Sequence, residues 1–285
     1  SIESNPGTLS IEKLTAYKDC GINRLSIGLQ ASQNSLLKQL GRIHTVEDYR
    51  ENILNARKAG FTNINTDLIF GLPGQSLKDW EESLLEVIDC GVEHLSCYSL
   101  IIEEGTVLGD CLEAGILEQP DEGLDRDMYH LTIEMLEGAG FKHYEISNFA
   151  KAGFECKHNL IYWSAGEYLG IGVGAHSYLE STRFNNTNGV EDYINSINKG
   201  IIPKENQQFI SNEEAILEYM LLGFRLRRGV STDAFYDRFN CDLFSIFSDK
   251  LDKLIKKGLI ENSEKHFYLT EKGLDFANEV FIEFI

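Results

Sequence analysis

Residues 64–71 alternate between two kinds of side chain, as a β-strand does. Ile64, Thr66 and Leu68 fall on one face, whereas Asn65 and Asp67 fall on the other, because successive side chains of a strand point to opposite faces. A parallel strand that is packed on both sides is apolar on both faces. The amide and the carboxylate on the second face therefore predict a strand that lines a ligand cavity.

The same pattern of helix, glycine and strand recurs along the first half of the chain. Apolar residues spaced about 3.6 positions apart predict helices, and each such stretch ends at a glycine that an apolar residue follows: Gly21, Gly60, Gly91 and Gly140. Glycine is the usual residue just after a helix. Strand-like stretches lie at residues 2–5, 24–30, 64–71, 94–100 and 142–147. This order predicts parallel βα units.

The first four predicted strands share a polar or small face. These positions are Glu3 and Asn5, then Ser26, Gly28 and Gln30, then Asn65 and Asp67, and finally Ser96 and Tyr98. A closed eight-stranded barrel fills its interior with branched apolar residues. A polar interior therefore favours an α/β fold with a partial barrel that holds a ligand inside.

The C-terminal part has a different pattern. Helices are expected at 212–226, 232–239, 243–257 and 271–281, with a small hairpin between the last two. Helices with a two-stranded wing resemble a winged-helix domain. The expected organisation is thus a partial barrel over 1–182, a polar linker over 183–208, and a small winged-helix-like α+β domain over 209–285.

Composition and charge narrow the functional classes. The chain has 285 residues and a formal net charge of −19, which argues against a nucleic acid as partner because such proteins usually present a basic surface. The C-terminal domain as a nucleic-acid adaptor is the weakest alternative, since its acids and lysines balance. No apolar run is long enough to span a membrane. Six scattered cysteines fit reduced thiols, so a cytoplasmic location is expected.

Several motifs together resemble a known family. They include Glu3-Ser4-Asn5-Pro6, the stretches 24–30, 40–42 and 65–74, and Tyr144-Glu145-Ile146-Ser147-Asn148-Phe149. On these residues the chain resembles radical S-adenosylmethionine (SAM) proteins of the oxygen-independent coproporphyrinogen III oxidase family, and most closely its HemW-type heme chaperone branch. The resemblance implies a partial (β/α)6 barrel that binds SAM and an iron–sulfur cluster.

The resemblance also implies roles for four residues. Glu3, Gln30, Arg42 and Asp67 match positions that contact SAM. A carboxylate suits the ammonium group of SAM, Arg and Gln suit its carboxylate, and an aspartate can accept hydrogen bonds from ribose hydroxyls. Taken singly, Asp67 could instead cap a turn, Gln30 could be an ordinary strand-end amide, and Arg42 could be a solvated surface charge.

His158 is the candidate heme ligand. The run His158-Asn159-Leu160-Ile161-Tyr162-Trp163 resembles the HNxxYW motif of the heme chaperone branch. A neutral imidazole is a common axial ligand of heme iron, and aromatic neighbours can stack on a porphyrin. A structural, hydrogen-bonded histidine is the alternative at this position. The competing enzymatic hypothesis is an oxygen-independent coproporphyrinogen III dehydrogenase of porphyrin biosynthesis.

One family feature is missing from the sequence. The family holds its [4Fe–4S] cluster with a CxxxCxxC loop, and the six cysteines here, at positions 20, 90, 97, 111, 156 and 241, contain no such spacing. Because the chain also begins with a strand-like stretch at Ser1 rather than with Met, we expect it to lack its N-terminal part. The cluster is then expected only in the full-length protein, with SAM and heme as the other bound groups and an unknown heme acceptor as partner.

Overall fold

The computed structural model describes residues 1–118 and 121–285, which form two compact units, 1–155 and 156–285. The first unit contains β1 (Ile2–Ser4), α1 (Ile11–Asp19), β2 (Leu25–Gln30), α2 (Asn34–Gln39), α3 (Val46–Lys58), β3 (Ile64–Phe70), α4 (Leu77–Asp89), β4 (His94–Ser99), α5 (Val107–Glu113), α6 (Glu122–Gly138), β5 (Lys142–Glu145) and β6 (Asn148–Ala150).

The strands of the first unit form one sheet in the order β1-β2-β3-β4-β6-β5. The first four strands run parallel, as the sequence predicted. The fifth predicted strand, β5, runs in the same direction as these four but does not pair with β4. The chain turns back after β5, and β6 lies between β4 and β5, antiparallel to both. Within the described part of this unit the sheet is open, with β1 and β5 as its edges, so it is an incomplete barrel.

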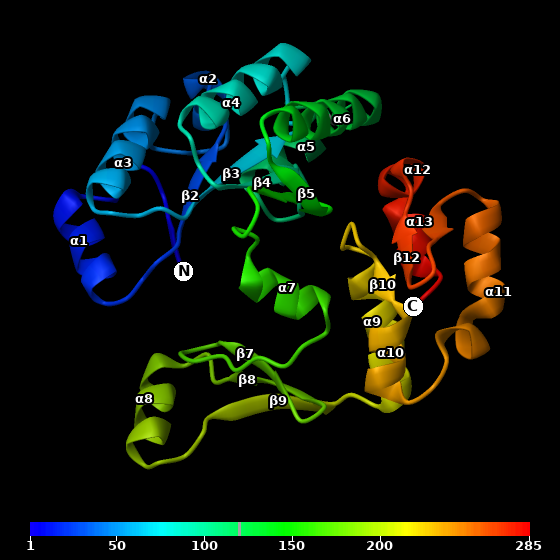
Figure 1. Cartoon of the computed structure of the whole chain (residues 1–285). Helices are drawn as coiled ribbons and strands as arrows, with labels where there is room; N and C mark the ends of the chain where they lie inside the picture. The colour runs from blue at the N-terminus through cyan, green and yellow to red at the C-terminus, as the bar shows by residue number, and fades with distance from the viewer. Residues whose placement is uncertain (119–120) are drawn as a thin grey trace. The chain divides into compact units, whose positions relative to one another are not determined.

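Helices α1, α3, α4 and α6 lie along one face of this sheet (Figure 1). The apolar strand face meets them, since Leu25, Ile27 and Leu29 are fully buried. On the same face the Tyr49 hydroxyl of α3 forms a 2.8 Å hydrogen bond with Thr66 Oγ1 of β3. The polar face of the strands therefore points away from the helices.

Local sequence signals explain where these helices begin and end. Thr45 and Asp48 form a capping box at the start of α3, and Ser76 and Asp79 do the same for α4, which satisfies backbone N–H groups that have no partner within the helix. All four glycines after the predicted helices have a positive φ, as a left-handed helix end requires.

The second unit contains two small sheets. Its elements are α7 (Lys157–Trp163), β7 (His176–Leu179), β8 (Thr182–Asn186), α8 (Val190–Asn198), β9 (Lys204–Phe209), α9 (Asn212–Gly223), β10 (Val230–Ser231), α10 (Thr232–Phe239), α11 (Leu243–Lys256), β11 (Ile260–Asn262), β12 (His266–Leu269), α12 (Glu271–Asp275) and α13 (Ala277–Ile282). The sheets have the orders β7-β8-β9 and β10-β12-β11. Buried phenylalanines, among them Phe224, Phe235 and Phe284, fill the core beside the second sheet.

The division of the chain differs from the expected one. The first unit ends at residue 155 rather than 182, and the stretch 183–208 contains most of β8, all of α8 and most of β9 instead of a structureless linker. The stretch was predicted to be a linker because its composition is polar. It is polar because β9 is an exposed edge strand with few apolar positions. The C-terminal helices and hairpin lie where predicted, although the last expected helix is divided into α12 and α13.

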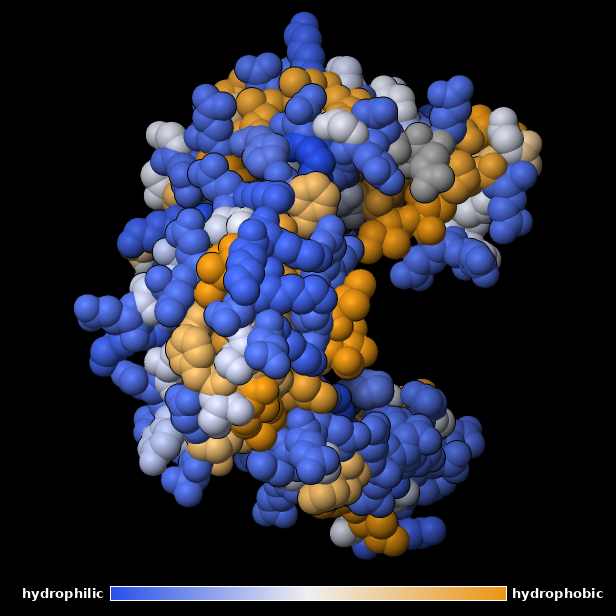
Figure 2. All heavy atoms as spheres, turned by 90° about the vertical axis from the view of Figure 1, so that its right-hand side faces the viewer, coloured by the Kyte–Doolittle hydropathy of each residue, from blue (hydrophilic) through white to orange (hydrophobic). Residues whose placement is uncertain are grey.

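No helix among the described residues is long and apolar enough to cross a membrane. Hydrophilic side chains cover most of the surface seen in Figure 2, and apolar side chains form separate patches between them.

Candidate functional site

The pairing register of the first sheet aligns polar residues in rows across neighbouring strands. Ser26 pairs with Asn65, and Asn65 with His94. One step further along the strands, Gly28 pairs with Asp67, and Asp67 with Ser96. Paired residues in a parallel sheet share a face, so the polar face predicted from alternation exists as a continuous surface.

Asp67 is held in place by its neighbours on this face. Its carboxylate accepts hydrogen bonds from Asn65 Nδ2 at 2.8 Å and from Ser26 Oγ at 3.1 Å. Asn65 Nδ2 also donates to Ser26 Oγ at 2.7 Å. The carboxylate is half-buried and keeps further lone pairs, so it can accept additional hydrogen bonds from a ligand.

His94 extends this network and was missed by the sequence analysis. The fully buried imidazole contacts Asn65 Oδ1 through Nδ1 and the Tyr144 hydroxyl through Nε2 at 2.8 Å. Burial, with a smaller effect from Arg24, lowers the pKa of His94 to about 3. The ring is therefore neutral at physiological pH. Because Asn65 Nδ2 faces a carboxylate, its Oδ1 must accept the Nδ1 proton, and Nε2 must accept the proton from Tyr144.

A second polar group surrounds Gly28, near the end of β2. The Arg42 guanidinium donates to Asn5 Oδ1 at 3.2 Å. A Cβ atom placed on Gly28 would lie 2.7 Å from Gln30 Nε2 and 3.7 Å from Asn5 Oδ1, so these side chains occupy the space that the glycine leaves open. Gln30 itself has φ of 73°, an uncommon conformation for this residue type that clusters at functional sites.

Three of the four predicted SAM residues therefore lie close together, and one lies apart. Gln30 and Arg42 gather around Gly28, and Asp67 is the partner of Gly28 on the next strand. Glu3 lies on edge strand β1, where it pairs with Ser26 and is exposed. Glu3 is thus on the same polar face but at its rim.

The residues present fit SAM but not an iron–sulfur cluster. SAM needs both donors and acceptors of hydrogen bonds. Asp67 offers a carboxylate with free lone pairs and Arg42 offers a guanidinium. Gln30 offers an amide that has no hydrogen-bond partner among the described residues. Within residues 1–118 and 121–285, no group of three or more His, Cys, Asp or Glu side chains is arranged to hold a metal ion. A hollow of about 650 Å³ follows β3, but its lining contains none of the four predicted residues.

The predicted heme ligand lies in the second unit. His158 is an exposed residue in the first turn of α7. Its ring makes an edge-on contact with Tyr162, with 4.7 Å between ring centroids, and Tyr162 contacts Tyr168 in the same way at 4.6 Å. The imidazole is therefore not a buried structural histidine: it is accessible and supported on one side by an aromatic pair.

The glycine-rich stretch that follows presents apolar side chains to solvent. Residues 169–173 form no strand, and within 168–173 only Tyr168 forms an isolated bridge, with Tyr178. Leu169 is 60% exposed and Ile171 84% exposed. Asn186 Nδ2 nevertheless binds the carbonyl oxygens of Gly170 and Gly172, so the backbone of this loop is fixed while its apolar side chains remain uncovered.

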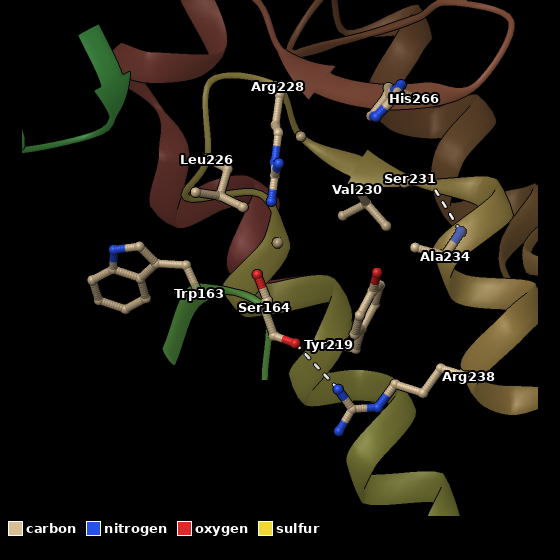
Figure 3. Close-up of a pocket in the computed structure, with 12 residues that line it drawn as sticks. Trp163, Ser164, Tyr219, Leu226, Arg228, Val230, Ser231, Ala234, Arg238 and His266 are labelled. Atoms are coloured by element: carbon tan, nitrogen blue, oxygen red, sulfur yellow. Dashed lines mark hydrogen bonds between the residues drawn. The ribbon is translucent and has the colours of Figure 1, made fainter. Parts of the chain in front are cut away.

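A pocket of about 440 Å³ lies beyond the end of α7 (Figure 3). It was not predicted. Ser164 contributes from the end of the helix, Tyr219 from α9, and Arg228 and Arg238 from the segments that follow. Arg238 donates to the carbonyl oxygens of Ser164 and Ala165 at 3.1 and 2.8 Å. Only tertiary packing brings these residues together, because they are far apart in the sequence.

Comparisons with known proteins agree with this architecture. Residues 1–87 match the radical SAM superfamily, and residues 210–276 match the HemN C-terminal domain. Proteins named heme chaperone HemW are 43% identical in Bacillus subtilis and 36% identical in Lactococcus lactis, and each alignment covers the whole chain and 75% of the relative.

A solved structure has a similar fold. Coproporphyrinogen III oxidase HemN from Escherichia coli, a radical SAM enzyme, matches 99% of this chain and 68% of its own length with a TM-score of 0.82. The sequence identity is 20%, so this likeness bears on the fold alone. The fold is therefore the α/β radical SAM fold, with a HemN-type C-terminal domain.

Proposed function

Because the chain belongs to the HemW heme chaperone family of radical SAM proteins, we propose that it binds heme through His158 and SAM through the polar strand face, and that it delivers heme to acceptor proteins. The observation that carries the proposal is the accessible imidazole of His158 beside an aromatic pair. The coproporphyrinogen dehydrogenase alternative is disfavoured, since the relatives that are 43% and 36% identical over the whole chain are named heme chaperones, whereas HemN is 20% identical.

The surroundings of His158 suit a flat apolar ligand. The ring nitrogens make no hydrogen bond among the described residues, so a lone pair is available to iron. Tyr162 and Tyr168 add aromatic surface. The exposed apolar side chains at Leu169 and Ile171 follow Tyr168 directly, and their burial under a porphyrin would contribute favourable free energy of about 25 cal/mol per Å².

The SAM site is proposed on the geometry of the first unit. Asp67 would accept hydrogen bonds from the ribose hydroxyls, Gln30 and Arg42 would hold the carboxylate, and Glu3 would meet the ammonium group at the rim. When bound to a [4Fe–4S] cluster, SAM is the radical source of this superfamily. Since the described residues offer no cluster site, we propose that the cluster is bound by sequence outside this chain. We also propose that the protein is located in the cytoplasm.

Heme titration tests the assignment of His158. We expect the wild-type protein to bind hemin with the Soret band of a histidine-ligated iron, and His158→Ala to lose that band position and to bind at least tenfold more weakly. His176→Ala is the matched control, because His176 is another exposed histidine of the same unit. An unchanged spectrum and affinity in His158→Ala would remove His158 from the heme site.

A further inference from the structure

The pocket beyond α7 has a cationic lining in an acidic protein. Twelve of the described residues line it, and none of these is Asp or Glu, although the chain carries 45 acidic residues against 26 basic ones. Arg228, Arg238 and His266 all contribute. Opposite charges normally surround a surface arginine, so a pocket that gathers two guanidinium groups without a carboxylate is prepared for an anion from outside.

The two arginines of the pocket differ in their hydrogen bonds. Arg238 is fixed by its bonds to the carbonyl oxygens of Ser164 and Ala165. Arg228 makes no hydrogen bond and no ion pair among the described residues, and its side chain extends toward Ser164 and Tyr219 in Figure 3. A guanidinium without a partner beside one that is already oriented can grip a carboxylate through two parallel hydrogen bonds.

Hydroxyl groups complete the set of donors. Ser231 Oγ accepts a hydrogen bond from Ala234 N at 3.2 Å, which leaves its own proton free for a ligand. The Tyr219 hydroxyl has no hydrogen bond among the described residues and points into the pocket (Figure 3). Burial raises the pKa of Tyr219, although Arg238 and Arg228 oppose the effect, so this hydroxyl stays protonated and can donate.

The position of the pocket relative to His158 suggests the ligand. His158 lies in the first turn of α7, and Ser164 follows the last residue of the same helix. Six residues of helix correspond to about 9 Å along the axis. A heme carries its two propionate carboxylates at the edge of the macrocycle, away from the iron. An anion pocket that begins at the other end of the helix from the iron ligand is placed to receive that edge.

We propose that this pocket binds the carboxylate groups of the porphyrin, with Arg228 as the main contact and Tyr219 and Ser231 as additional donors. The inference rests on the proposed heme-binding function and adds the part of the ligand that is recognised. The proposal predicts that the affinity of the protein for heme depends on the carboxylates of the porphyrin as well as on the iron.

The test compares three ligands: hemin, hemin dimethyl ester, which has no free carboxylates, and protoporphyrin IX, which has no iron. We expect Arg228→Gln to weaken the binding of hemin and protoporphyrin IX about tenfold and to leave the binding of the ester unchanged. Tyr219→Phe should act in the same direction with a smaller effect. Lys199→Gln is the control, because it removes one exposed positive charge of the same unit away from the pocket.

The outcomes separate this inference from the proposed function. If Arg228→Gln binds hemin as the wild type does, or loses affinity for the acid and the ester alike, the pocket does not recognise carboxylates. If His158→Ala leaves the hemin spectrum unchanged while protoporphyrin IX still depends on Arg228, the carboxylate pocket stands and the iron ligand is wrong. If no wild-type porphyrin binding occurs at all, both proposals fall.

Discussion

Asn65 donates a 2.8 Å hydrogen bond to Asp67, its neighbour on the same face of β3. The same amide accepts from His94 and from Ser96 through Oδ1. Asn65 thus joins a buried, neutral imidazole to the carboxylate that we assign to SAM. A side chain held by several bonds keeps a fixed orientation, which lowers the entropic cost of binding a ligand.

Asp67→Asn should weaken SAM binding. The substitution keeps the size of the side chain but removes the charge and replaces one acceptor oxygen by a donor. A hydrogen bond to a charged group contributes about 1.5–3 kcal/mol, so we expect roughly 10- to 100-fold lower affinity in equilibrium binding of SAM to the protein. Asp127→Asn is the control, because Asp127 is an exposed acid of α6. Equal affinity in both variants would contradict the assignment.

Gly28→Ala should displace Gln30 without unfolding the protein. The added Cβ would lie 2.7 Å from Gln30 Nε2, which is the end of a flexible side chain and can move. We expect the melting temperature to change by a few degrees at most, while the affinity for SAM falls several-fold because the amide is moved away. If SAM binding stays at the wild-type level, Gln30 does not contact the ligand.

His94→Gln should flatten the response of stability to acid. The imidazole is neutral in the folded protein down to a pKa of about 3, whereas in the unfolded chain it gains a proton below about 6.5. The unfolded state therefore binds more protons, and stability falls as pH decreases from 6.5 toward 3. Urea unfolding should show the wild type losing about 2 kcal/mol more than the variant between pH 6.5 and 5. If the stabilities of the wild type and the variant fall in parallel with pH, the pKa of His94 is not lowered in the folded protein.

Gly229→Ala should destabilise the C-terminal domain severely. Gly229 has φ of +71°, and an added Cβ would lie 1.9 Å from the carbonyl oxygen of Phe267 on β12. The backbone conformation alone costs about 1–2 kcal/mol for a residue with a Cβ, and the clash with a backbone atom cannot be relieved by a side-chain rotation. Gly200 has the same φ of +71° but open space around it. Thermal unfolding of Gly200→Ala therefore measures the cost of the backbone conformation without the clash. Equal losses in the two variants would show that the clash is unimportant.

Trp80→Phe should be more costly than Trp163→Phe. The Trp80 indole is fully buried, and its Nε1 donates to Met128 O at 3.0 Å and to Thr132 Oγ1 at 2.9 Å. Replacing it removes these bonds and leaves a small cavity, at a cost of about 1–3 kcal/mol. Trp163 Nε1 is buried without a hydrogen-bond partner in the part of the chain that the structure describes, so removing this N–H should change the free energy of unfolding little. Chemical denaturation measures both, and the reverse order would contradict this reading of the two indoles.

The sequence predicted the elements that depend on local signals. Alternation placed Asn65 and Asp67 on one face of a strand, and capping residues such as Ser76 fixed where helices begin. The prediction failed at β9, which was assigned to a polar linker. An exposed edge strand has few apolar positions, so its sequence resembles that of a loop. The prediction also missed His94: alternation places this residue on the same face as Ser96 and Tyr98, but only the pairing register brings it to Asn65.

By itself, then, the sequence determined the βα order and the polar strand face, because these depend on short-range periodicity. The SAM and heme candidates came from the motifs that resemble a known family. Tertiary structure alone decided the rest. Pairing register placed His94 beside Asn65, the β5–β6 reversal put an antiparallel strand next to β4, and packing of α9 and α10 against the end of α7 brought Tyr219 and Arg238 to Ser164. Such contacts join residues that are distant in the chain, and no local pattern encodes which of them will meet.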